Sequence, residues 1–523
     1  MTIDSFCLKC VRNNFHNLGI DPEFGLCDSA EAELMKEETC EALFDALYRS
    51  ENEEDKQRFI HLTELYSSNR NDYNLRDMLF VLYKFTRNFA EPDKWLDNNL
   101  KMYDEELFQS VWVKDALDRS MSAAEYYSKL FKKLTVDMAA EYGFEGTYEE
   151  VMRQYPPMVS HTMSDVWGKQ WDFAVMCAES ANEIKEAYCS DPREMWDKLY
   201  SVYRKMSQAK YFPDVRKSGK MRENDKWDEY NERRKQLFNS FRSDTGELVM
   251  SSADETERRF KTLGSSLADI IWLLRKFDNL YMALKEKRGA YEFHDIEHMT
   301  YRLFCNEDIR NEYKNMYDEI LIDEYQDTNG LQDAIFGAIS ENNMFMVGDL
   351  KQSIYRFRGG DPFIFKKWSA EYLKGEGGVR IALSQNFRSR REILDSVNSV
   401  FGGVMSDRVG DVVYEGDECL CREKDYYTEN GCDHKSEFHI IPVISDSGDD
   451  VLEDIENERL EAAHIAAQIR SMLDNGYRVF CGTDEDGNAQ YRNMLSRDVA
   501  ILASSVRNIA DIYTEELEKQ GIA

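Results

Sequence analysis

Apolar and small side chains recur at helical spacing from Asp21 to about Arg288. Asp28 and Glu31 stand where a helix would begin, three residues apart as in a capping box. The positions that follow on one helical face are Met35, Thr39, Ala42, Leu43, Ala46 and Leu47. Because this spacing is typical of an amphipathic helix and continues with few prolines, we predict an all-helical domain over residues 21–288.

The pattern changes near Tyr291, where short continuous apolar runs replace the helical spacing. The runs are residues 320–322, 344–347, 379–383 and 499–503, and the first three lead into acids, glycine or amides. Helix-length segments separate them. Runs of this length that end in polar residues are typical of buried parallel strands. We therefore predict an α/β fold with a parallel sheet for residues 289–523.

Length and composition set outer limits on the protein. A chain of 523 residues has room for about three domains. Its hydrophobic content of 42% is typical of a globular protein, and it has no apolar run of the roughly 18 residues that a membrane span needs. The first residues show no basic stretch followed by an apolar core, so we predict no membrane partner and a cytoplasmic location.

Charge is unevenly distributed along the chain. The formal net charge is −33, which at first argues against a nucleic-acid partner, because phosphate binding depends on Lys and Arg. Residues 344–392, however, hold ten Lys or Arg and five acids, so this segment is +5 and the rest of the chain is −38. Basic side chains are thus concentrated in one segment, and the acidic excess elsewhere is better explained as a solvated surface.

The segment ILIDEYQDTN, residues 320–329, carries the sharpest chemical signal. Its apolar start delivers Asp323 and Glu324 to the carboxyl end of a predicted strand, where α/β sheets bind ligands. One carboxylate can hold Mg²⁺ through water while the other polarises an attacking water, as hydrolysis of a nucleoside triphosphate requires. Strands often end in acids, so this pair alone does not decide between a catalytic and a structural role.

Two later segments add specificity. They are GDLKQSIYRFR, residues 348–358, and QNFRSR, residues 385–390. With DEYQD before them, in this order, the chain resembles the UvrD/Rep class of superfamily 1 DNA helicases. TIDSFC at residues 2–7, FHDIEH at residues 293–298 and the complete DEYQDTN resemble the AddA branch of that class, whose members are ATP-dependent helicase/nuclease subunits. The resemblance covers both ends of the chain, and the helical middle only by its position and character.

The resemblance implies a fold, a set of domains and a set of ligands. It implies RecA-like P-loop motor domains, built on parallel sheets, with a large all-helical insertion. The first motor domain would take residues 1–20 and 289–378, the insertion residues 21–288, and an incomplete second motor domain residues 379–523. ATP and Mg²⁺ would be the cofactors, single- and double-stranded DNA the substrate, and an AddB-like subunit the partner.

The resemblance also assigns roles to single residues around the nucleotide. Asp323 would position Mg²⁺ through water, and Glu324 would be the catalytic carboxylate. Gln326 and Gln352 would contact the γ-phosphate, because an amide can donate to phosphate and accept from water. Arg388 would act as an arginine finger from the second motor domain. The other residues expected around the nucleotide are Asp327, Gln385 and Phe387, of which Phe387 would stack on adenine.

A second set of residues would contact DNA. Tyr355 would stack on a base, a contact that tolerates any sequence and so suits a motor that moves along a strand. The other expected DNA contacts are Arg356, Arg358, Thr2, Ser5 and Phe6. The last three belong to TIDSFC and would lie on the path of the single strand.

Two pairs of residues have the spacing of metal ligands. His294 and His298 stand four residues apart on a predicted helix, a spacing that can hold a metal. Their place in FHDIEH favours a structural role or one near DNA instead. Cys7 and Cys10 form a lone CxxC without a partner pair at zinc-finger spacing, so we interpret them as thiols without a metal.

One element of the family pattern is missing from the sequence. No GxxxxGK[ST] phosphate-binding loop occurs in the 523 residues, and in the family this loop lies upstream of the segment that resembles TIDSFC. No carboxylate cluster replaces the nuclease domain of the AddA branch. We therefore expect weak or no ATP hydrolysis, and no nuclease activity, from this polypeptide alone.

Three functions remain open on this evidence. The first is an AddA-like subunit, truncated here, of a 3′ to 5′ helicase that acts in double-strand-break repair and recombination. The second is a UvrD- or RecB-like helicase of another branch. The third is a non-catalytic module that binds single-stranded DNA or a partner subunit. Intact DEYQD, Gln352 and Arg388 favour a working motor, and the missing loop favours the binding module.

Overall fold

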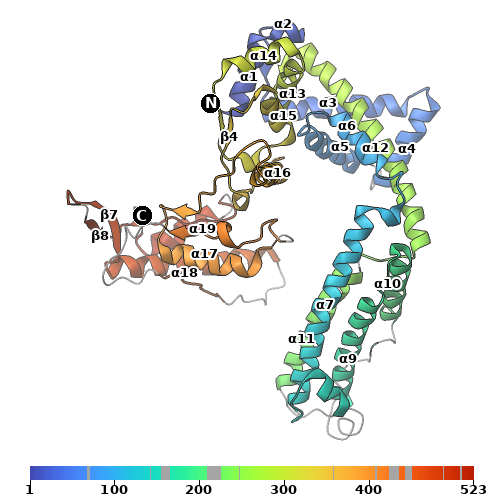
Figure 1. The fold of residues 1–523 in the computed structure, drawn as a ribbon, viewed down its shortest axis with the longest axis vertical. Coiled ribbons are helices and arrows are strands. Elements are labelled where there is room, and N and C mark those ends of the chain that lie inside the picture. The colour runs from blue at the N-terminus through green and yellow to red at the C-terminus, as the bar shows by residue number, and fades with distance from the viewer. Residues whose placement is uncertain are drawn as a thin grey trace. The chain divides into compact units, whose positions relative to one another are not determined.

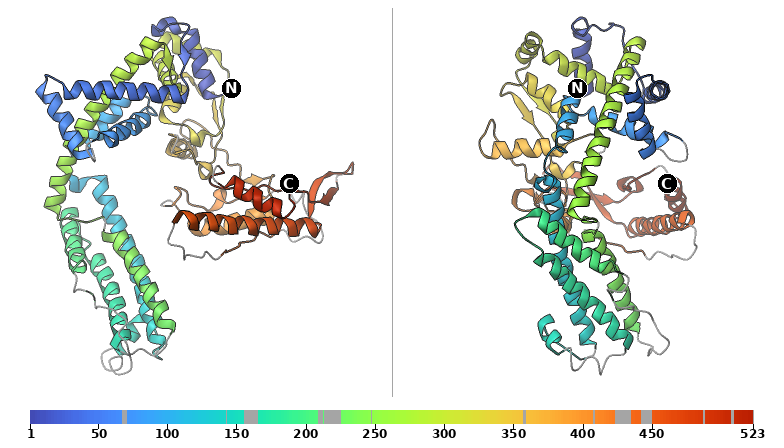
Figure 2. Two further views of the ribbon diagram at one scale, coloured as in Figure 1. Left: turned by 180° about the vertical axis from the view of Figure 1, so that it is seen from behind. Right: turned by 90° about the vertical axis from the view of Figure 1, so that its right-hand side faces the viewer.

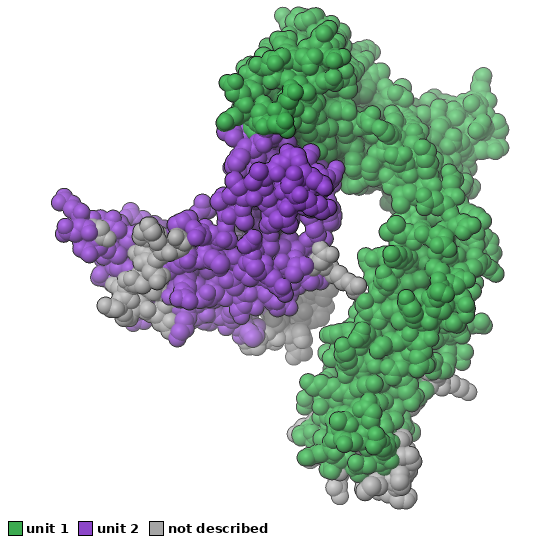
Figure 3. Space-filling model, in the orientation of Figure 1, with its two compact units in different colours: residues 1–320, 328–343 green, residues 321–327, 344–523 purple. Residues whose placement is uncertain are grey.

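The computed structural model describes residues 1–523 except 67–70, 142, 155–164, 209–211, 213–224, 247, 357–358, 407–408, 423–434, 442–449, 487, 507–508 and 523. This described part divides into two compact units (Figure 3). Unit 1 holds residues 1–320 and 328–343, and unit 2 holds residues 321–327 and 344–523. The boundary therefore falls twice near DEYQDTN, whose last residues belong to unit 1.

Unit 1 is built mainly of helices (Figure 1). They are α1 (Ile3–Asn13), α2 (Phe15–Leu18), α3 (Ser29–Tyr48), α4 (Glu53–Tyr66), α5 (Tyr73–Thr86), α6 (Pro92–Lys101), α7 (Val111–Ala140), α9 (Asp165–Glu186), α10 (Pro192–Met206), α11 (Asp225–Gly246), α12 (Ala253–Arg288), α13 (Phe293–Phe304), α14 (Glu307–Met316) and α15 (Gly330–Ile339). The short strands β1 (Gly25–Leu26) and β2 (Ala290–Tyr291) pair in parallel. The helices predicted from the apolar spacing are thus present.

The start of α3 shows how the sequence specifies a helix here. The Asp28 carboxylate accepts hydrogen bonds from the backbone N of Ala30 and Glu31, so it caps the helix as predicted. Of the predicted apolar face, the buried members are Met35, Thr39, Leu43 and Leu47, whereas Ala42 and Ala46 are exposed. The buried face is rotated relative to the predicted one, because Ala32, Cys40 and Phe44 are also buried where α3 packs against α4 and α12.

Unit 1 contains more than one hydrophobic core. One core lies among α7, α9, α10 and α11 and includes Phe131 and Trp171, both fully buried. Another lies among α3, α4, α5 and α12 and includes Phe59 and Phe277. The 36-residue helix α12 contributes to both, with Ala253 at its start in the first core (Figure 2). This helix therefore joins two cores that are otherwise built by different segments.

Unit 2 combines helices with short strands. The strand β3 (Ile320–Ile322), which begins in unit 1, forms a two-stranded sheet with β4 (Met344–Met346). The other elements are α16 (Pro362–Leu373), β5 (Gln385–Asn386), α17 (Arg391–Val404), β6 (Cys421–Arg422), α18 (Asp450–Asp474), β7 (Arg478–Thr483), β8 (Ala489–Asn493) and α19 (Ala510–Lys519). The strands β5 and β6 are parallel, whereas β7 and β8 form an antiparallel pair.

Of the four predicted strands, two form and two do not. The runs at 320–322 and 344–347 form β3 and β4, and the bonds from Val347 N to Ile322 O and from Tyr325 N to Val347 O advance in the same direction along both, as in a parallel pair. The strands predicted at 379–383 and 499–503 are wrong. A strand requires a hydrogen-bonded neighbour, and none of the described residues pairs with these two runs.

The apolar faces of the strand segments are only partly covered. In β3, Ile320 and Ile322 are buried but Leu321 is 68% exposed, so the prediction that this strand is buried on both faces is wrong. The described strands cluster in small two-stranded sheets rather than in one large sheet. Within the described residues, no helix is both long and apolar enough to cross a membrane.

Candidate functional site

The two acids of DEYQDTN lie directly after β3, as predicted. Asp323 and Glu324 are both exposed, and Asp323 Oδ1 accepts a hydrogen bond from the backbone N of Glu324 at 3.0 Å. Glu324 has a φ of 52°, a left-handed conformation that costs a non-glycine residue roughly 1–2 kcal/mol. The 3₁₀ turn Tyr325–Asp327 follows, with Tyr325 fully buried. The strained backbone therefore stands between a strand end and a buried anchor, a situation typical of functional sites.

Gln326 connects this turn to the segment after β4. Its side chain is buried, its Nε2 donates to Glu324 Oε2 at 2.7 Å, and its Oε1 accepts from the backbone N of Asp349 at 3.0 Å. A Cβ atom on Gly348 would lie 2.5 Å from Gln326 Oε1, so a glycine is needed for the amide to approach this closely. The glutamine thus fixes the orientation of the Glu324 carboxylate.

Asp349 extends the network to Gln352 and Lys351. Its carboxylate accepts from Gln352 Nε2 at 3.1 Å and from Lys351 Nζ at 2.8 Å. Burial alone would raise the pKa of Asp349, but the hydrogen bonds from Lys351 and Gln352 and the charge of Lys351 hold it below its ordinary value. Lys351 Nζ also contacts Glu418 Oε2 at 2.7 Å. A continuous set of contacts therefore runs from Glu324 to Gln352, all within unit 2.

Lys351 has no role in the sequence analysis, although it stands inside GDLKQSIYRFR. Burial alone would lower the pKa of Lys351, but its hydrogen bonds to Asp349 and Glu418 and their charges raise it above its ordinary value. Arg380 reaches the same Glu418, at 3.5 Å. The signal that could have found Lys351 is the alternation of Asp349 and Lys351 in the short turn after β4. Its partner Glu418 is 67 residues away and could not be identified from spacing.

Asp327 is the last residue of the 3₁₀ turn Tyr325–Asp327. Burial, and then the charge of Glu324, raises the pKa of Asp327. Its Oδ1 is buried and has no hydrogen-bond partner among the residues that the structure describes. A Cβ atom on Gly360 would lie 2.9 Å from the backbone O of Asp327, so the glycine permits a close backbone approach. An unsatisfied buried carboxylate oxygen is costly unless a ligand or water completes it.

The residues of QNFRSR lie apart from this network. Gln385 belongs to β5 and is exposed, as are Phe387 and Arg388. Asn386 shapes the turn, because its Oδ1 accepts from the backbone N of Arg388 at 2.9 Å and of Ser389 at 2.8 Å. In the described part of the chain, no hydrogen bond or ion pair joins Arg388 to Glu324 or Gln352. Glu324 and Gln352 are linked through Gln326 and Asp349, and the convergence of both with Arg388 stays a prediction.

The predicted DNA contacts near residue 355 are at the surface. Tyr355 is 37% exposed, and Arg356 Nη2 contacts Asp411 Oδ2 at 3.2 Å. The Arg356 guanidinium also lies 5.1 Å from the centre of the Phe363 ring. Arg358 lies outside the described residues. Tyr355 and Arg356 thus occupy positions that a polynucleotide can reach.

The predicted contacts in TIDSFC divide between surface and core. Thr2 caps α1, its Oγ1 accepts from the backbone N of Ser5 at 3.2 Å, and both residues are exposed. Phe6 is buried and packs against aromatic rings that include Phe304 and Phe336, the latter with its centroid at 5.6 Å. The structure places Phe6 in the core of unit 1, so we do not retain it as a DNA contact.

The residues with metal-ligand spacing each have a protein partner. His298 Nε2 lies 3.0 Å from the backbone O of Arg87, and His294 Nδ1 lies 3.2 Å from Glu297 Oε2. Cys7 and Cys10 are buried thiols. Within the described residues, no group of three or more His, Cys, Asp or Glu side chains is arranged to hold a metal ion.

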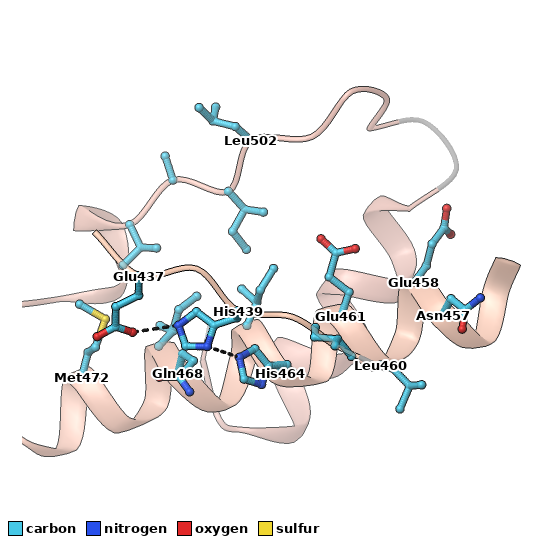
Figure 4. A pocket seen from close by; sticks show the side chains of 16 residues that line it. Glu437, His439, Asn457, Glu458, Leu460, Glu461, His464, Gln468, Met472 and Leu502 are labelled. Atoms are coloured by element: carbon cyan, nitrogen blue, oxygen red, sulfur yellow. Dashed lines mark hydrogen bonds and ion pairs between the residues drawn. The ribbon is translucent and has the colours of Figure 1, made fainter. Parts of the chain in front are cut away.

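A cavity of about 830 Å³ lies elsewhere in unit 2 (Figure 4). His439 faces it and contacts Glu437 at 2.8 Å and His464 at 2.9 Å. Aliphatic residues such as Ile465 and Ile501 form much of the remaining wall. The described residues that line this cavity include none of the predicted site residues, so it is not the candidate site.

Comparison with known proteins gives this geometry a family context. Residues 1–372 match the family model of the UvrD/REP helicase N-terminal domain. The chain belongs to the UvrD/REP helicase family. The match includes DEYQDTN and GDLKQSIYRFR, and therefore the whole set of contacts from Glu324 to Gln352.

The sequence of this UvrD/REP family member aligns over its full length with longer relatives. Three proteins, each named as a subunit of an ATP-dependent helicase/nuclease, align with the entire chain: from Bacillus cytotoxicus at 29% identity, and from Clostridium novyi and Clostridium acetobutylicum at 30% identity each. The alignments cover 40%, 41% and 42% of these three proteins. The chain thus spans about two-fifths of the length of the relatives it matches.

Proposed function

We propose that this chain is part of an ATP-driven DNA helicase, an AddA-like subunit that moves 3′ to 5′ and acts in double-strand-break repair and recombination in the cytoplasm. The observation that carries the proposal is the set of contacts from Glu324 through Gln326 and Asp349 to Gln352, in a chain of the UvrD/REP family. These contacts bring two motifs 23 residues apart into one polar site at a strand end.

The proposed architecture follows the family. Residues 1–20 and 289–378 would form the first RecA-like motor domain, residues 21–288 a helical insertion, and residues 379–523 part of a second motor domain. The helices α3 to α12 and the parallel β3 and β4 pair support this division. Its boundaries differ from those of the two compact units, because unit 1 includes the whole predicted insertion together with residues 1–20 and 289–320 on either side of it.

The proposed chemistry is attack of water on the γ-phosphate of ATP. Glu324 accepts a proton from the attacking water, the bond between the γ-phosphorus and the bridging oxygen breaks, and ADP and phosphate leave. The bond from Gln326 Nε2 to Glu324 Oε2 orients this carboxylate before the nucleotide arrives. In the proposal Gln326 and Gln352 then donate to phosphate oxygens, because an amide can exchange a carboxylate acceptor for a phosphate.

Asp323 fits a role in holding Mg²⁺ through water. It is exposed at the strand end, and one of its oxygens accepts from the backbone N of Glu324, while no residue in the described part of the chain donates to the other. Mg²⁺ is commonly held by one or two carboxylates together with phosphate oxygens and water, so a larger cluster of protein ligands is not required. When bound, the ion would neutralise charge on the phosphates, while Asp323 would fix its place beside Glu324.

The remaining roles rest on the family and on exposure. Arg388 would reach the γ-phosphate and Phe387 would stack on adenine, and both side chains are exposed as such roles require. Asp327 and Gln385 would complete the nucleotide site. For DNA, the proposed contacts are Tyr355, Arg356, Arg358, Thr2 and Ser5. An AddB-like partner subunit is proposed from the names of the relatives, which call them subunits.

A fusion polypeptide tests the proposal. The chain would be joined in frame to the flanking segments of the Clostridium novyi relative, because the family's phosphate-binding loop lies upstream of TIDSFC. We expect the fusion to hydrolyse ATP with stimulation by single-stranded DNA, whereas the 523-residue chain alone shows little turnover. In the fusion, Tyr355→Ala should reduce stimulation by DNA about tenfold, since one stacked base contact is lost. A correctly folded fusion that binds ATP but never hydrolyses it contradicts the proposal.

A second candidate function is a module that binds single-stranded DNA or a partner subunit without turnover. The exposed side chains of Tyr355 and Arg356 would serve such a module as well as a motor. Such a module would bind DNA in the isolated chain with an affinity independent of ATP and Mg²⁺. A filter-binding measurement with and without Mg-ATP, on both the chain and the fusion, separates the two functions.

A further inference from the structure

The end of DEYQDTN is tied into unit 1 by buried polar contacts that the proposed chemistry does not use. Asn329 caps α15 and forms a reciprocal capping box with Gln332. Its Nδ2 also donates to Asn88 Oδ1 at 3.4 Å, and the backbone N of Leu331 donates to the backbone O of Asn88 at 2.8 Å. Asn88 and Asn329 are both buried, so these bonds are shielded from water.

Asn88 follows Arg87 at the end of α5, and Arg87 belongs to a buried set of charges. Arg87 Nη2 donates to Asp295 Oδ1 at 3.4 Å. Asp295 Oδ2 in turn accepts from Lys285 Nζ at 2.6 Å. Lys285 stands in the last turn of α12, and Asp295 in the first turn of α13. The contacts therefore link the ends of three helices to the residue that receives Asn329.

Lys285 is the centre of this set, because its side chain is fully buried. Its Nζ contacts Asp295 at 2.6 Å, Glu292 Oε2 at 2.9 Å and Tyr83 Oη at 3.1 Å, which gives each of its three protons an acceptor. A buried ammonium without these partners would be strongly unfavourable. The positions of the three acceptors are thus fixed by the requirement to satisfy one charge.

A second route leads from α15 to α13. Gln332 Nε2 donates to Glu297 Oε1 at 2.7 Å, and the Glu297 side chain is buried. Glu297 lies two residues after Asp295, in the same FHDIEH segment. The first turn of α15 is therefore held to α13 directly through Gln332 and indirectly through Asn88.

We propose that Lys285 and Asn88 are positioning residues for the end of DEYQDTN. The contacts from Lys285 through Asp295 and Arg87, and from Asn88 to Asn329, hold Asn329 and the start of α15, all within unit 1. The inference rests on the proposed function, because the position of this motif matters for ATP hydrolysis. Since α12 supplies Lys285 and also part of two hydrophobic cores, the helical region takes part in placing the end of this motif at Asn329.

Hydrogen–deuterium exchange of the 523-residue chain tests the proposal without ATP. Lys285→Met removes the ammonium and keeps the length of the side chain. We expect the amides of residues 330–333 to exchange about tenfold faster, as when a buried hydrogen-bonded support is lost. Lys276→Met is the matched control, on the same helix and paired with Asp55 at 3.0 Å nearer the surface, and should leave these amides unchanged.

Asn329→Asp separates the link to Asn88 from the capping of α15. Aspartate caps a helix as well as asparagine, but it cannot donate to Asn88 Oδ1. In the Asn329→Asp background, Lys285→Met should raise exchange at residues 330–333 clearly less than in the parent, because the side-chain link to Asn88 is already lost while the bonds of Leu331 N and Gln332 Nε2 remain. A tenfold rise in both backgrounds, or one that spreads equally to α7 and α9, shows that Lys285 only stabilises the fold and overturns the proposal.

Asn88→Ala keeps the proposal testable if Lys285→Met does not fold. We expect faster exchange at residues 330–333 by about five- to tenfold, with α9 unchanged, because only the side-chain link is removed. Unchanged exchange at residues 330–333 overturns the proposal. These experiments contain no nucleotide, so their failure leaves the proposed ATP hydrolysis intact. Loss of ATP turnover in the fusion, with normal exchange in the chain, would refute the proposed function instead.

Discussion

The helical cores of unit 1 and the strand segments of unit 2 are both rich in apolar residues, but they differ in burial. Phe59 and Leu62 of α4 are fully buried, whereas Leu321 of β3 and Phe345 of β4 are 68% and 54% exposed. In the unpaired run at 379–383, Ile381 and Leu383 are 69% and 83% exposed. A helix satisfies its own backbone and needs only a neighbour for its apolar stripe. A strand depends on neighbours for its hydrogen bonds and for both faces. Local contacts therefore satisfy the backbone hydrogen bonds of a helix, whereas the hydrogen bonds of a strand require partners from other parts of the chain.

The largest expected effect comes from the core of the helical region. Phe131 is fully buried among α7, α9 and α11, so Phe131→Ala should lower the free energy of unfolding by about 3–5 kcal/mol. The matched change in unit 2 is Leu383→Ala, at a side chain that is 83% exposed, and it should cost less than about 0.5 kcal/mol. Urea unfolding followed by circular dichroism measures both. Equal losses would abolish the contrast between the two regions.

Buried polar groups should make unit 1 sensitive to acid. Burial, and then the charge of Arg87, lowers the pKa of His298 from 6.5 to about 3. The unfolded chain therefore binds more protons below pH 6.5, and the stability present above that value is lost as pH falls toward 3. We expect a loss of about 2–3 kcal/mol by pH 4 from this group.

The control for this prediction is a histidine at the surface. His298→Gln keeps a side-chain amide that can donate to the backbone O of Arg87, and it should flatten the loss between pH 6.5 and 4. His16→Gln, at an exposed position, should leave the pH profile unchanged. Stability would be followed by urea titration at each pH. An unaltered profile in His298→Gln would remove His298 from the explanation.

Helix caps give a smaller and more local comparison. Asp28 caps α3, which packs into a core, and Asp361 caps α16, in which only Pro362 is buried. Asp28→Ala should cost about 1 kcal/mol in the unfolding of unit 1. Asp361→Ala should cost about half of that, because α16 has little packing to lose with it. Thermal melts of the two variants at one pH decide the order, and the reverse order would contradict it.

The variant with the smallest expected effect on stability, Leu383→Lys, should instead change the self-association of the chain. Leu383→Lys replaces an exposed apolar side chain in an unpaired segment, so the free energy of unfolding should shift by less than about 0.5 kcal/mol. The added charge should nevertheless reduce self-association, since exposed apolar strand segments favour edge contacts. Sedimentation velocity over a range of concentrations measures this, with Lys374→Arg as a control that keeps the charge. Equal self-association in both variants would show that residues 379–383 do not mediate it.

The features that the sequence could predict are those that depend on local contacts. The helices, the cap at Asp28 and the strands β3 and β4 follow from local spacing, and so does the placement of Asp323 and Glu324 at a strand end. The approach of Gln326 to Asp349 required only that two neighbouring strands end at the same edge.

The features that sequence missed depend on distant partners. The partner of Lys351 is Glu418, which no spacing rule identifies. Phe6 follows the polar residues Asp4 and Ser5 in TIDSFC, yet its ring packs in a core made by residues about 300 positions later. The run at 379–383 has the composition of a strand, but strand formation depends on a neighbour rather than on composition. Arg388 would need a second element to bring it to Glu324.

The central claim is that Glu324, oriented by Gln326, activates the water that attacks ATP. The most direct measurement is the turnover and nucleotide Kd of the fusion polypeptide with Glu324→Gln, beside Glu319→Gln, an exposed glutamate just before β3. We expect Glu324→Gln to lower kcat at least about a hundredfold while the Kd for Mg-ATP stays within about twofold, and Glu319→Gln to match the parent. Unchanged turnover in Glu324→Gln would contradict the catalytic assignment.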